Sequence, residues 1–521
     1  MLSCKPSLRR WGVKPVEQLR LHTSDLIHLW PELTLVIAAV ALSLLDLALP
    51  ERMNRTFIGW LTLASLLVSG VFVAMQLHLD VPVELLAGSY RVDDFANLLK
   101  LVFLLGTSFV VLMSVGTIKQ AGIAHVGEYY YFLLPATLGA MVMASSADMI
   151  TLYVGLELLS ITSYIMVAMR KKSSNSNEGA FKYLVMGGIS SAMILYGMSF
   201  LYGISGATNL AAVKDGIYAN FTSFEALIYV AFFFLIAGLG FKIAAAPFHS
   251  WAPDVYEGAP TPISAFLAVV SKGAAFAILF RIIYNLFIPL PQDGPTGVLV
   301  SDVFLTLGVV AAMAMIVGNV IALRQTNAKR LLAYSGIANA GYLLVPLATQ
   351  FSTAHYSNFA EFTFYLIAYL FMNIGAFAVI ILIEKSSGSE EIRGFAGLYY
   401  RAPFTAVAMT LLVLSLAGIP ITGGFFGKLF ILLGTMETHH YWLGAIMLIT
   451  SVISFYYYFG IVRQMYMRSD YESAPLQVPG TVGFTVWLCA IVTVLLGIFP
   501  HVLLQYIDTV FTITKDLLFV S

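Results

Sequence analysis

Ionisable residues stand inside long apolar stretches of this sequence, where charged groups are otherwise rare. Glu157 lies in LYVGLELLSITSYI, and Lys242, Lys272 and Lys428 lie in GLGFKIAAAPFHSW, AVVSKGAAF and AGIPITGGFFGKLF. An ionisable group in the middle of a membrane-spanning helix costs about 2.5–3.5 kcal/mol on insertion scales, so it normally faces a protein interior or a water-filled path. Because one carboxylate cannot neutralise three lysines, a set of static ion pairs is the weaker interpretation.

The chemistry that these residue types can perform is proton transfer. Burial favours the neutral amine of a lysine and a nearby carboxylate favours the ammonium, so a lysine balanced between the two can load and release a proton near neutral pH. We predict a relay with Lys242 as its central site and Glu157 as a mobile counter-charge. Lys272 and His249 would form the link across the centre, and Lys428 the exchange point to the opposite side. His249 stands beside a proline and could equally cap the backbone.

Two further cations have simpler interpretations from the sequence alone. Lys182 follows Glu178 by one helical turn, so it could pair with that carboxylate at the membrane interface as readily as join the relay. Arg281, about two turns beyond Lys272, is more typical of an interfacial anchor.

The elements that must position these residues are membrane helices. The chain has 521 residues, of which 59% are hydrophobic and 11% charged, against roughly 45–50% and 25% in soluble domains.

Its formal net charge is zero, which makes nucleic acid an improbable partner. Cys4 and Cys489 lie at opposite ends of the chain and form no metal-binding pattern. No GxGxxG motif points to a nicotinamide or flavin cofactor in this chain.

Apolar runs of membrane-spanning length recur almost from end to end, and their continuity excludes a β-barrel. We predict an all-α polytopic membrane protein with about fourteen transmembrane helices, which are 26–49, 58–76, 95–117, 129–147, 149–169, 180–203, 225–246, 262–289, 302–322, 333–348, 362–384, 405–433, 441–466 and 482–507. The segment 1–25 is basic but lacks the apolar stretch of a signal peptide, so we interpret it as an N-terminal extension.

The distribution of Lys and Arg predicts the orientation. The loops after the odd-numbered helices hold most of them, namely Arg52, Arg55, Lys119, Arg170, Lys171, Lys172, Arg324, Lys329, Arg330, Lys385, Arg393, Arg401, Arg463 and Arg468. The loops after the even-numbered helices hold Arg91 and Lys214, and the C-terminal tail holds Lys515. We therefore expect the odd-numbered loops to face the cytoplasm and both termini to lie outside.

Helices 7 and 12 contain residues that break helices. Helix 7 is interrupted around Gly238, Gly240 and Pro247, and helix 12 at Gly418, Pro420, Gly423, Gly424 and Gly427. Freed carbonyls at membrane depth are tolerated only where they line a cavity or are buried in protein. If helices 4–8 (129–289) and 9–13 (302–466) are five-helix repeats, the odd number of crossings makes them inverted, and each broken helix is the fourth of its repeat. The remaining parts would be peripheral helices at 26–117 and a C-terminal helix within 482–521. Glycines that merely permit close packing would not explain the lysine beside each break.

The stretch HSWAPDVYEGAPTPISAFLAVVSKGAAFAILFR (249–281) resembles the subunit N family of the proton-pumping NADH–quinone oxidoreductases, respiratory complex I. GLELLSITSY (155–164), FMNIGAFAV (371–379) and LSLAGIPITGGFFGKLF (414–430) agree with it. The similarity spans about helices 4 to 13, and the PDVYEGAPTP block is its most specific part. The basic N-terminal segment has no match in the family pattern.

The resemblance implies an antiporter-like subunit whose proton-path residues match Glu157, Lys182, Lys242, Lys272 and Lys428. It also implies that FMN, iron–sulfur clusters and quinone belong to partner subunits that transfer electrons from NADH to quinone, with no cofactor in this chain. Partners would be other membrane-arm subunits, among them antiporter-like sister subunits and small membrane subunits, in the inner membrane of a bacterial cell. The alternatives are a subunit of a multisubunit sodium/proton antiporter and a purely structural subunit with inert ion pairs.

Overall fold

A computed structural model describes residues 23–50, 53–118, 122–288, 290, 293–349, 356–468 and 476–519. Most of the predicted N-terminal extension, and Cys4 within it, lies outside these residues. The helices are α1 (Thr23–His28), α2 (Trp30–Ala48), α3 (Thr56–Ala74), α4 (Asp94–Ser114), α5 (Val126–Ser145), α6 (Met149–Val167), α7 (Ser174–Ser205), α8 (Leu210–Lys242), α9 (Ala252–Gly258), α10 (Thr261–Phe266), α11 (Lys272–Ile282), α12 (Pro295–Ala322), α13 (Ala328–Ala348), α14 (Asn358–Ser387), α15 (Leu398–Arg401), α16 (Pro403–Ala417), α17 (Gly423–Glu437), α18 (Tyr441–Met467), α19 (Gly480–Ile498) and α20 (Pro500–Val510).

Short irregular elements complete the described chain. A hairpin of β1 (Val83–Leu85) and β2 (Tyr90–Val92) encloses the 3₁₀ turn η3 (Leu86–Gly88), and Glu84 pairs with Arg91 in its antiparallel register. A second 3₁₀ turn is η7 (Ile392–Phe395), and π-helical turns are η5 (Leu267–Ser271), η6 (Ile283–Phe287) and η8 (Ile513–Leu517).

The prediction of an all-α polytopic membrane protein is confirmed. Twelve helical stretches in the described residues are long and apolar enough to cross a membrane. The other two predicted spans are α5 and the broken pair of α16 and α17. The predicted last span, 482–507, was too long, because α19 ends at Ile498 and α20 is a separate short helix that begins at Pro500, a residue that cannot continue the hydrogen-bond ladder. The predicted span 225–246 began too late, because α8 begins at Leu210.

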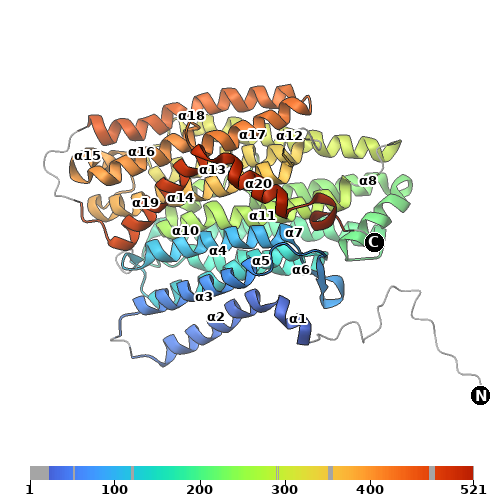
Figure 1. Cartoon of the computed structure of the whole chain (residues 1–521), viewed down its shortest axis with the longest axis horizontal. Coiled ribbons are helices and arrows are strands. Elements are labelled where there is room, and N and C mark those ends of the chain that lie inside the picture. The colour runs from blue at the N-terminus through green and yellow to red at the C-terminus, as the bar shows by residue number, and fades with distance from the viewer. Residues whose placement is uncertain are drawn as a thin grey trace, which may run out of the picture.

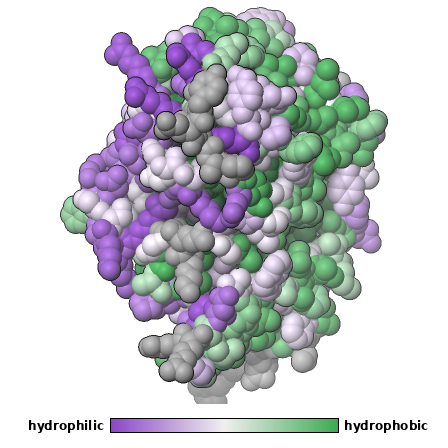
Figure 2. All heavy atoms as spheres, turned by 90° about the vertical axis from the view of Figure 1, so that its left-hand side faces the viewer, coloured by the Kyte–Doolittle hydropathy of each residue, from purple (hydrophilic) through white to green (hydrophobic). Residues whose placement is uncertain are grey.

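Burial orders the helices from the centre of the bundle to its edge. The apolar stretch of Thr261–Phe287 is completely buried, whereas only 22% of that of α2 and 33% of that of α18 are buried. Figure 1 shows α2 and α18 at opposite edges, with α10, α11 and α14 between them. Figure 2 looks at the end that is on the left of Figure 1, where hydrophilic side chains gather over one part and hydrophobic side chains cover much of the rest.

The broken helices are confirmed, but the positions of the breaks differ from the prediction. In the first, α8 continues through Gly238 and Gly240 and ends at Lys242. A side chain at Gly238 would lie 2.8 Å from the Ser190 carbonyl oxygen of α7, so this glycine permits close packing. In the second, α16 ends at Ala417 and α17 begins at Gly423. Gly424 and Gly427 are therefore helical packing residues as well.

Candidate proton-relay site

Lys242 is the last residue of α8 and is buried. Its ammonium donates hydrogen bonds to two hydroxyl groups, the Ser160 Oγ of α6 at 2.9 Å and the Ser191 Oγ of α7 at 3.3 Å. Both acceptors are neutral, and both helices present them from inside the bundle. The lysine is thus held in place without a carboxylate in hydrogen-bond contact.

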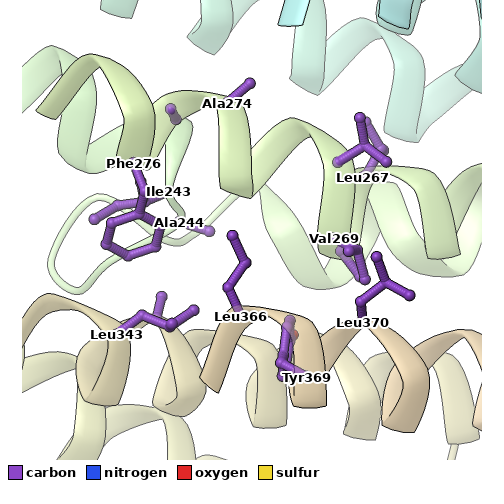
Figure 3. Packing of buried hydrophobic residues seen from close by; sticks show 14 of the residues in the cluster. Ile243, Ala244, Leu267, Val269, Ala274, Phe276, Leu343, Leu366, Tyr369 and Leu370 are labelled. Atoms are coloured by element: carbon purple, nitrogen blue, oxygen red, sulfur yellow. The ribbon is translucent and has the colours of Figure 1, made fainter. Parts of the chain in front are cut away.

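The chain beyond Lys242 turns back into the protein. Ala244 adopts a left-handed conformation with φ of 57°, which residues other than glycine rarely adopt. The Phe241 carbonyl, at the end of the helix, accepts hydrogen bonds from the Ala244 N–H at 2.9 Å and from the Trp251 Nε1 at 3.0 Å. The Trp251 ring stacks on Tyr183 of α7 with 4.5 Å between ring centroids. Figure 3 shows Ile243 and Ala244 beside Phe276 in the packed interior.

Glu157 lies on α6, three residues before Ser160 and therefore on the same side of that helix. Its Oε1 atom is buried and has no hydrogen-bond partner. Its charge acts on Lys242 electrostatically, although no hydrogen bond joins the two. Glu157 can therefore act as a counter-charge near Lys242, and no hydrogen bond fixes its Oε1 atom.

Lys272 is the first residue of α11 and directly follows the π-helical turn η5. Its buried ammonium donates to the Gly336 carbonyl of α13 at 2.6 Å. A Cβ atom on Gly336 would lie 2.8 Å from the Lys272 Nζ and 3.0 Å from the Tyr369 hydroxyl, which is itself buried and without a hydrogen-bond partner. The backbone of Gly336 therefore brings these two polar groups to one point.

His249 lies in the turn between α8 and α9 and is half-buried. Its ring faces Tyr334 of α13 at 6.5 Å between centroids, and its Nδ1 atom is buried without a partner. No hydrogen bond joins it to Lys272, although both residues reach α13, at Tyr334 and at Gly336. A link between the two side chains stays a prediction.

Lys428 lies on α17, and its ammonium reaches back to the end of α16. It donates to the carbonyls of Leu416 at 2.9 Å and Ala417 at 3.3 Å, and it lies 3.5 Å from the Ser451 Oγ. The ring of Tyr342 faces the ammonium at 4.9 Å. The lysine beside the second break thus satisfies the carbonyls that the break frees.

Lys182 stands in a different environment from the other lysines of the predicted relay. Its side chain is 39% exposed and contacts two carboxylates, Glu178 and Asp254, each at 2.6 Å. Arg330 of α13 also binds Asp254 at 2.6 Å. Burial raises the pKa of the Asp254 carboxyl, but hydrogen bonds from Lys182 and Arg330 outweigh burial and hold the pKa below its usual range. The predicted pair with Glu178 is present, and Asp254 is the partner that sequence reasoning missed.

Other buried cations in the described residues are paired with carboxylates. Lys100 binds Glu32 at 2.8 Å, Lys329 binds Glu390 at 2.7 Å and Arg281 binds Asp93 at 2.7 Å. The side chains of all three cations are fully buried. Arg281 was predicted as an interfacial anchor, whereas it lies inside the protein. The pairing divides the buried cations into two classes, those with a carboxylate partner and those with neutral acceptors only.

A strip of neutral polar side chains lies in the second half of the bundle, and sequence reasoning missed it. On α13, Ser335, Asn339 and Tyr342 follow one another at spacings of four and three residues, which places them on one face. Ser335 bonds to Tyr458 of α18, and Asn339 accepts a hydrogen bond from Tyr365 of α14. The strip begins at Ser335, next to Gly336, the carbonyl of which binds Lys272. It ends at Tyr342, the ring of which faces Lys428.

Comparison with known proteins gives the family. Residues 146–454 match the family model described as NADH:quinone oxidoreductase/Mrp antiporter, TM. NADH-quinone oxidoreductase subunit N of Paenibacillus sp. (strain JDR-2) is 54% identical over 95% of this chain and 98% of the relative. The chain belongs to the subunit N family of NADH-quinone oxidoreductase. The family predicted from the PDVYEGAPTP block is confirmed.

Two solved structures resemble this chain over most of its length. A chain of respiratory complex I from Thermus thermophilus with bound aureothin is 30% identical, covers 92% of this chain and all of its own length, and has a TM-score of 0.76. A chain of the Mrp complex from Dietzia sp. has a TM-score of 0.77 over 93% of this chain at 19% identity. The second likeness shows the shared fold alone.

Proposed function

We propose that this subunit N family member translocates protons in the membrane arm of an NADH–quinone oxidoreductase, by a relay of Glu157, Lys242, Lys272 and Lys428. The observation that supports it most is the contrast between the two classes of buried cation. Lys242, Lys272 and Lys428 have hydroxyl or carbonyl acceptors, whereas the other buried cations named above have carboxylates.

Neutral acceptors suit a group that changes its protonation state. An ammonium beside a carboxylate at hydrogen-bond distance is held charged by that partner. A lysine bonded to a carbonyl can donate an N–H as the ammonium and also as the neutral amine. The Gly336 carbonyl can therefore bind Lys272 in both states, and the Leu416 carbonyl can do so for Lys428. Such sites can accept and release a proton without losing their hydrogen bonds.

The proposed route follows the polar groups through the bundle. Protons on Lys242, beside Glu157, pass by way of intervening water to Lys272. From there the strip of Ser335, Asn339 and Tyr342 on α13 leads towards Lys428, which the ring of Tyr342 faces. His249, between α8 and α9, is the proposed link across the centre. Water is required wherever consecutive groups are not hydrogen-bonded.

Two inverted five-helix repeats, helices 4–8 and 9–13 of the predicted spans, are part of the proposal. α8 and the pair of α16 and α17 occupy equivalent places in the two groups, and each carries a buried lysine beside its break. Repeats of this kind place a transport site at their interface near the bilayer midplane. Lys272, in the completely buried stretch Thr261–Phe287, is the residue proposed for that place.

Gly336→Ala tests the Lys272 site with a small change. The added methyl group would lie 2.8 Å from the Lys272 Nζ, so the ammonium must shift away from its carbonyl. We expect the rate of proton translocation to fall by up to about a hundredfold, the scale on which a shift of about 1 Å reduces catalysis. The complex should still assemble, because alanine favours a helix over glycine.

The matched control for Gly336→Ala is Gly188→Ala, since a Cβ atom on Gly188 of α7 meets no atom within 4 Å. This variant should pump like the unmodified complex. Equal pumping by the two variants would contradict a role for the Lys272 ammonium at that position.

Lys182 is proposed as the residue at which protons enter the relay. Lys182→Met leaves Asp254 bound to Arg330, and an exposed ion pair contributes only about 0–1 kcal/mol, so thermal stability should change little. We expect proton uptake by inverted vesicles to slow by several-fold, with Lys171→Met as the control because Lys171 is exposed in the preceding loop. If both variants take up protons at the unmodified rate, Lys182 is an ion-pair residue and not part of the relay.

In the proposal, partner subunits supply the redox groups of the complex. FMN, iron–sulfur clusters and quinone would reside in partner subunits, and electron transfer from NADH to quinone there would drive proton movement here. The partners would include antiporter-like sister subunits and small membrane subunits, in a bacterial inner membrane with both termini outside. The name of the Thermus thermophilus complex supports this assembly.

A subunit of a sodium/proton antiporter is the alternative, and purification from native membranes separates the two. Under the proposal, affinity purification of the tagged chain yields subunits with iron–sulfur clusters, and the preparation oxidises NADH with quinone. A stable membrane complex without these subunits, which exchanges sodium for protons in vesicles, would replace the proposal by the antiporter.

A further inference from the structure

A groove on the outer side of α18 is not used by the proposed relay. It has a volume of about 860 Å³, within the range of about 300–1,000 Å³ that is usual for ligand pockets. Its walls come from the loop between α12 and α13, the start of α13, η7 and the C-terminal half of α18. The α18 face is among the most exposed surfaces of the bundle, with Tyr456 73% and Met467 79% exposed.

The groove is apolar along most of its length. On α18 its lining runs from Phe455 to Met467, a rise of about 18 Å at 1.5 Å per residue. This length is close to half of a hydrocarbon core of about 30 Å. Leu323, Phe459 and Val462 contribute apolar side chains. One leaflet's acyl chain therefore matches the groove in length and in chemistry.

Cationic residues complete the lining. Arg393 of η7 and Arg463 of α18 both line the groove, and its described lining includes no acidic residue. Neither arginine forms an ion pair with another described residue, in contrast to Arg170, Arg281 and Arg330. Arg393 lies in a loop predicted to face the cytoplasm, and Arg463 lies in the last turns of α18, next to another such loop. Anionic lipids are concentrated in the cytoplasmic leaflet.

We propose that this groove binds one anionic glycerophospholipid, with the phosphate between Arg393 and Arg463 and an acyl chain along α18. Arginine binds phosphate oxygens in pairs through its planar fork. Two arginines that have no carboxylate partner among the described residues, on the wall of an apolar groove, complement a lipid with an anionic headgroup better than a zwitterionic lipid or an apolar helix of another subunit.

Gly460 allows the acyl-chain part of the site to be tested separately. It lies in the groove, and a Cβ atom there would meet no atom within 4 Å. Gly460→Leu therefore fills the groove without displacing protein, and leucine favours a helix over glycine. Gly188→Leu is the matched control, because Gly188 is also an open helical glycine but lies on α7.

The experiment reconstitutes the purified whole complex into nanodiscs of phosphatidylglycerol or phosphatidylcholine and images the groove by electron cryomicroscopy. We expect ordered lipid density in phosphatidylglycerol and little in phosphatidylcholine. In mixed nanodiscs the double variant of Arg393→Ala and Arg463→Ala should bind phosphatidylglycerol with an apparent affinity about thirtyfold lower. Gly460→Leu should abolish the density, whereas Arg324→Ala and Gly188→Leu should keep it.

Three results would overturn the proposal. They are an empty groove in phosphatidylglycerol, equal density in both lipids, and a polypeptide segment of a neighbouring subunit seated along α18. Each of them leaves the proposed relay untouched, because none of the groove variants changes a relay lysine.

Discussion

Lys242→Met is expected to abolish most proton translocation by the assembled complex. Methionine fills similar space but carries no exchangeable proton, and Ser160 and Ser191 lose their donor. Since an acid–base group contributes about 10²-fold or more to proton transfer, we expect the pumping rate to fall by at least this factor. The measurement is acidification of inverted vesicles during NADH oxidation, normalised to the amount of assembled complex.

Lys214→Met is the control for this prediction, because Lys214 lies on the same helix but at its opposite end, next to Asp215. It should pump normally. Unchanged pumping by Lys242→Met in a complex assembled to normal levels would contradict the relay and would favour a structural role for this chain.

Arg281→Met is expected to have the largest effect on stability. Arg281 is fully buried and binds both carboxylate oxygens of Asp93 at 2.8 and 2.7 Å, and it also donates to the Ala144 carbonyl at 3.1 Å and to the Asp516 carbonyl at 3.1 Å. Its removal leaves the buried Asp93 carboxylate with Arg91, at 3.2 Å, as its cation partner, and breaking one side of a buried ion pair costs up to about 3–5 kcal/mol. We expect a lower amount of assembled complex and a lower melting temperature of the purified complex.

Asp93→Asn combined with Arg281→Met tests the cause. Removing both charges avoids a buried carboxylate that is held by Arg91 alone, so the double variant should recover part of the stability that the single variant loses. If the double variant is no more stable than Arg281→Met, the weakened charge pairing of Asp93 is not the source of the loss. The contacts that Arg281 makes with the C-terminal segment at Asp516 would then account for it.

The lysines proposed for the relay could be located in the sequence because a charge in an apolar run is conspicuous. Lys242 and Lys428 stand beside Gly and Pro, and each indeed lies at a break. The exact break in α8 could not be predicted, since Gly238 and Gly240 are compatible with both a break and close helix packing. Only the contact of Gly238 with α7 decides between them.

The partners of the buried charges could not be predicted, because they come from distant parts of the chain. Glu32 and Lys100 are on α2 and α4, and Lys182 and Asp254 are 72 residues apart. The neutral strip on α13 was missed because Tyr, Asn and Ser do not stand out in an apolar helix as charges do. Its signal was the spacing of Ser335, Asn339 and Tyr342 on one helix face. The π-helical turn before Lys272 could not be predicted, because its apolar residues are equally compatible with an α-helix.

The most direct test of the central claim is the number of protons translocated per NADH oxidised by the assembled complex with Lys428→Arg. Arginine keeps the positive charge and the donors for the Leu416 and Ala417 carbonyls, but a guanidinium does not release its proton in proteins. The relay predicts that the ratio falls in this variant. A ratio equal to that of the unmodified complex would contradict the account, because it would show that Lys428 needs only its charge and does not exchange a proton.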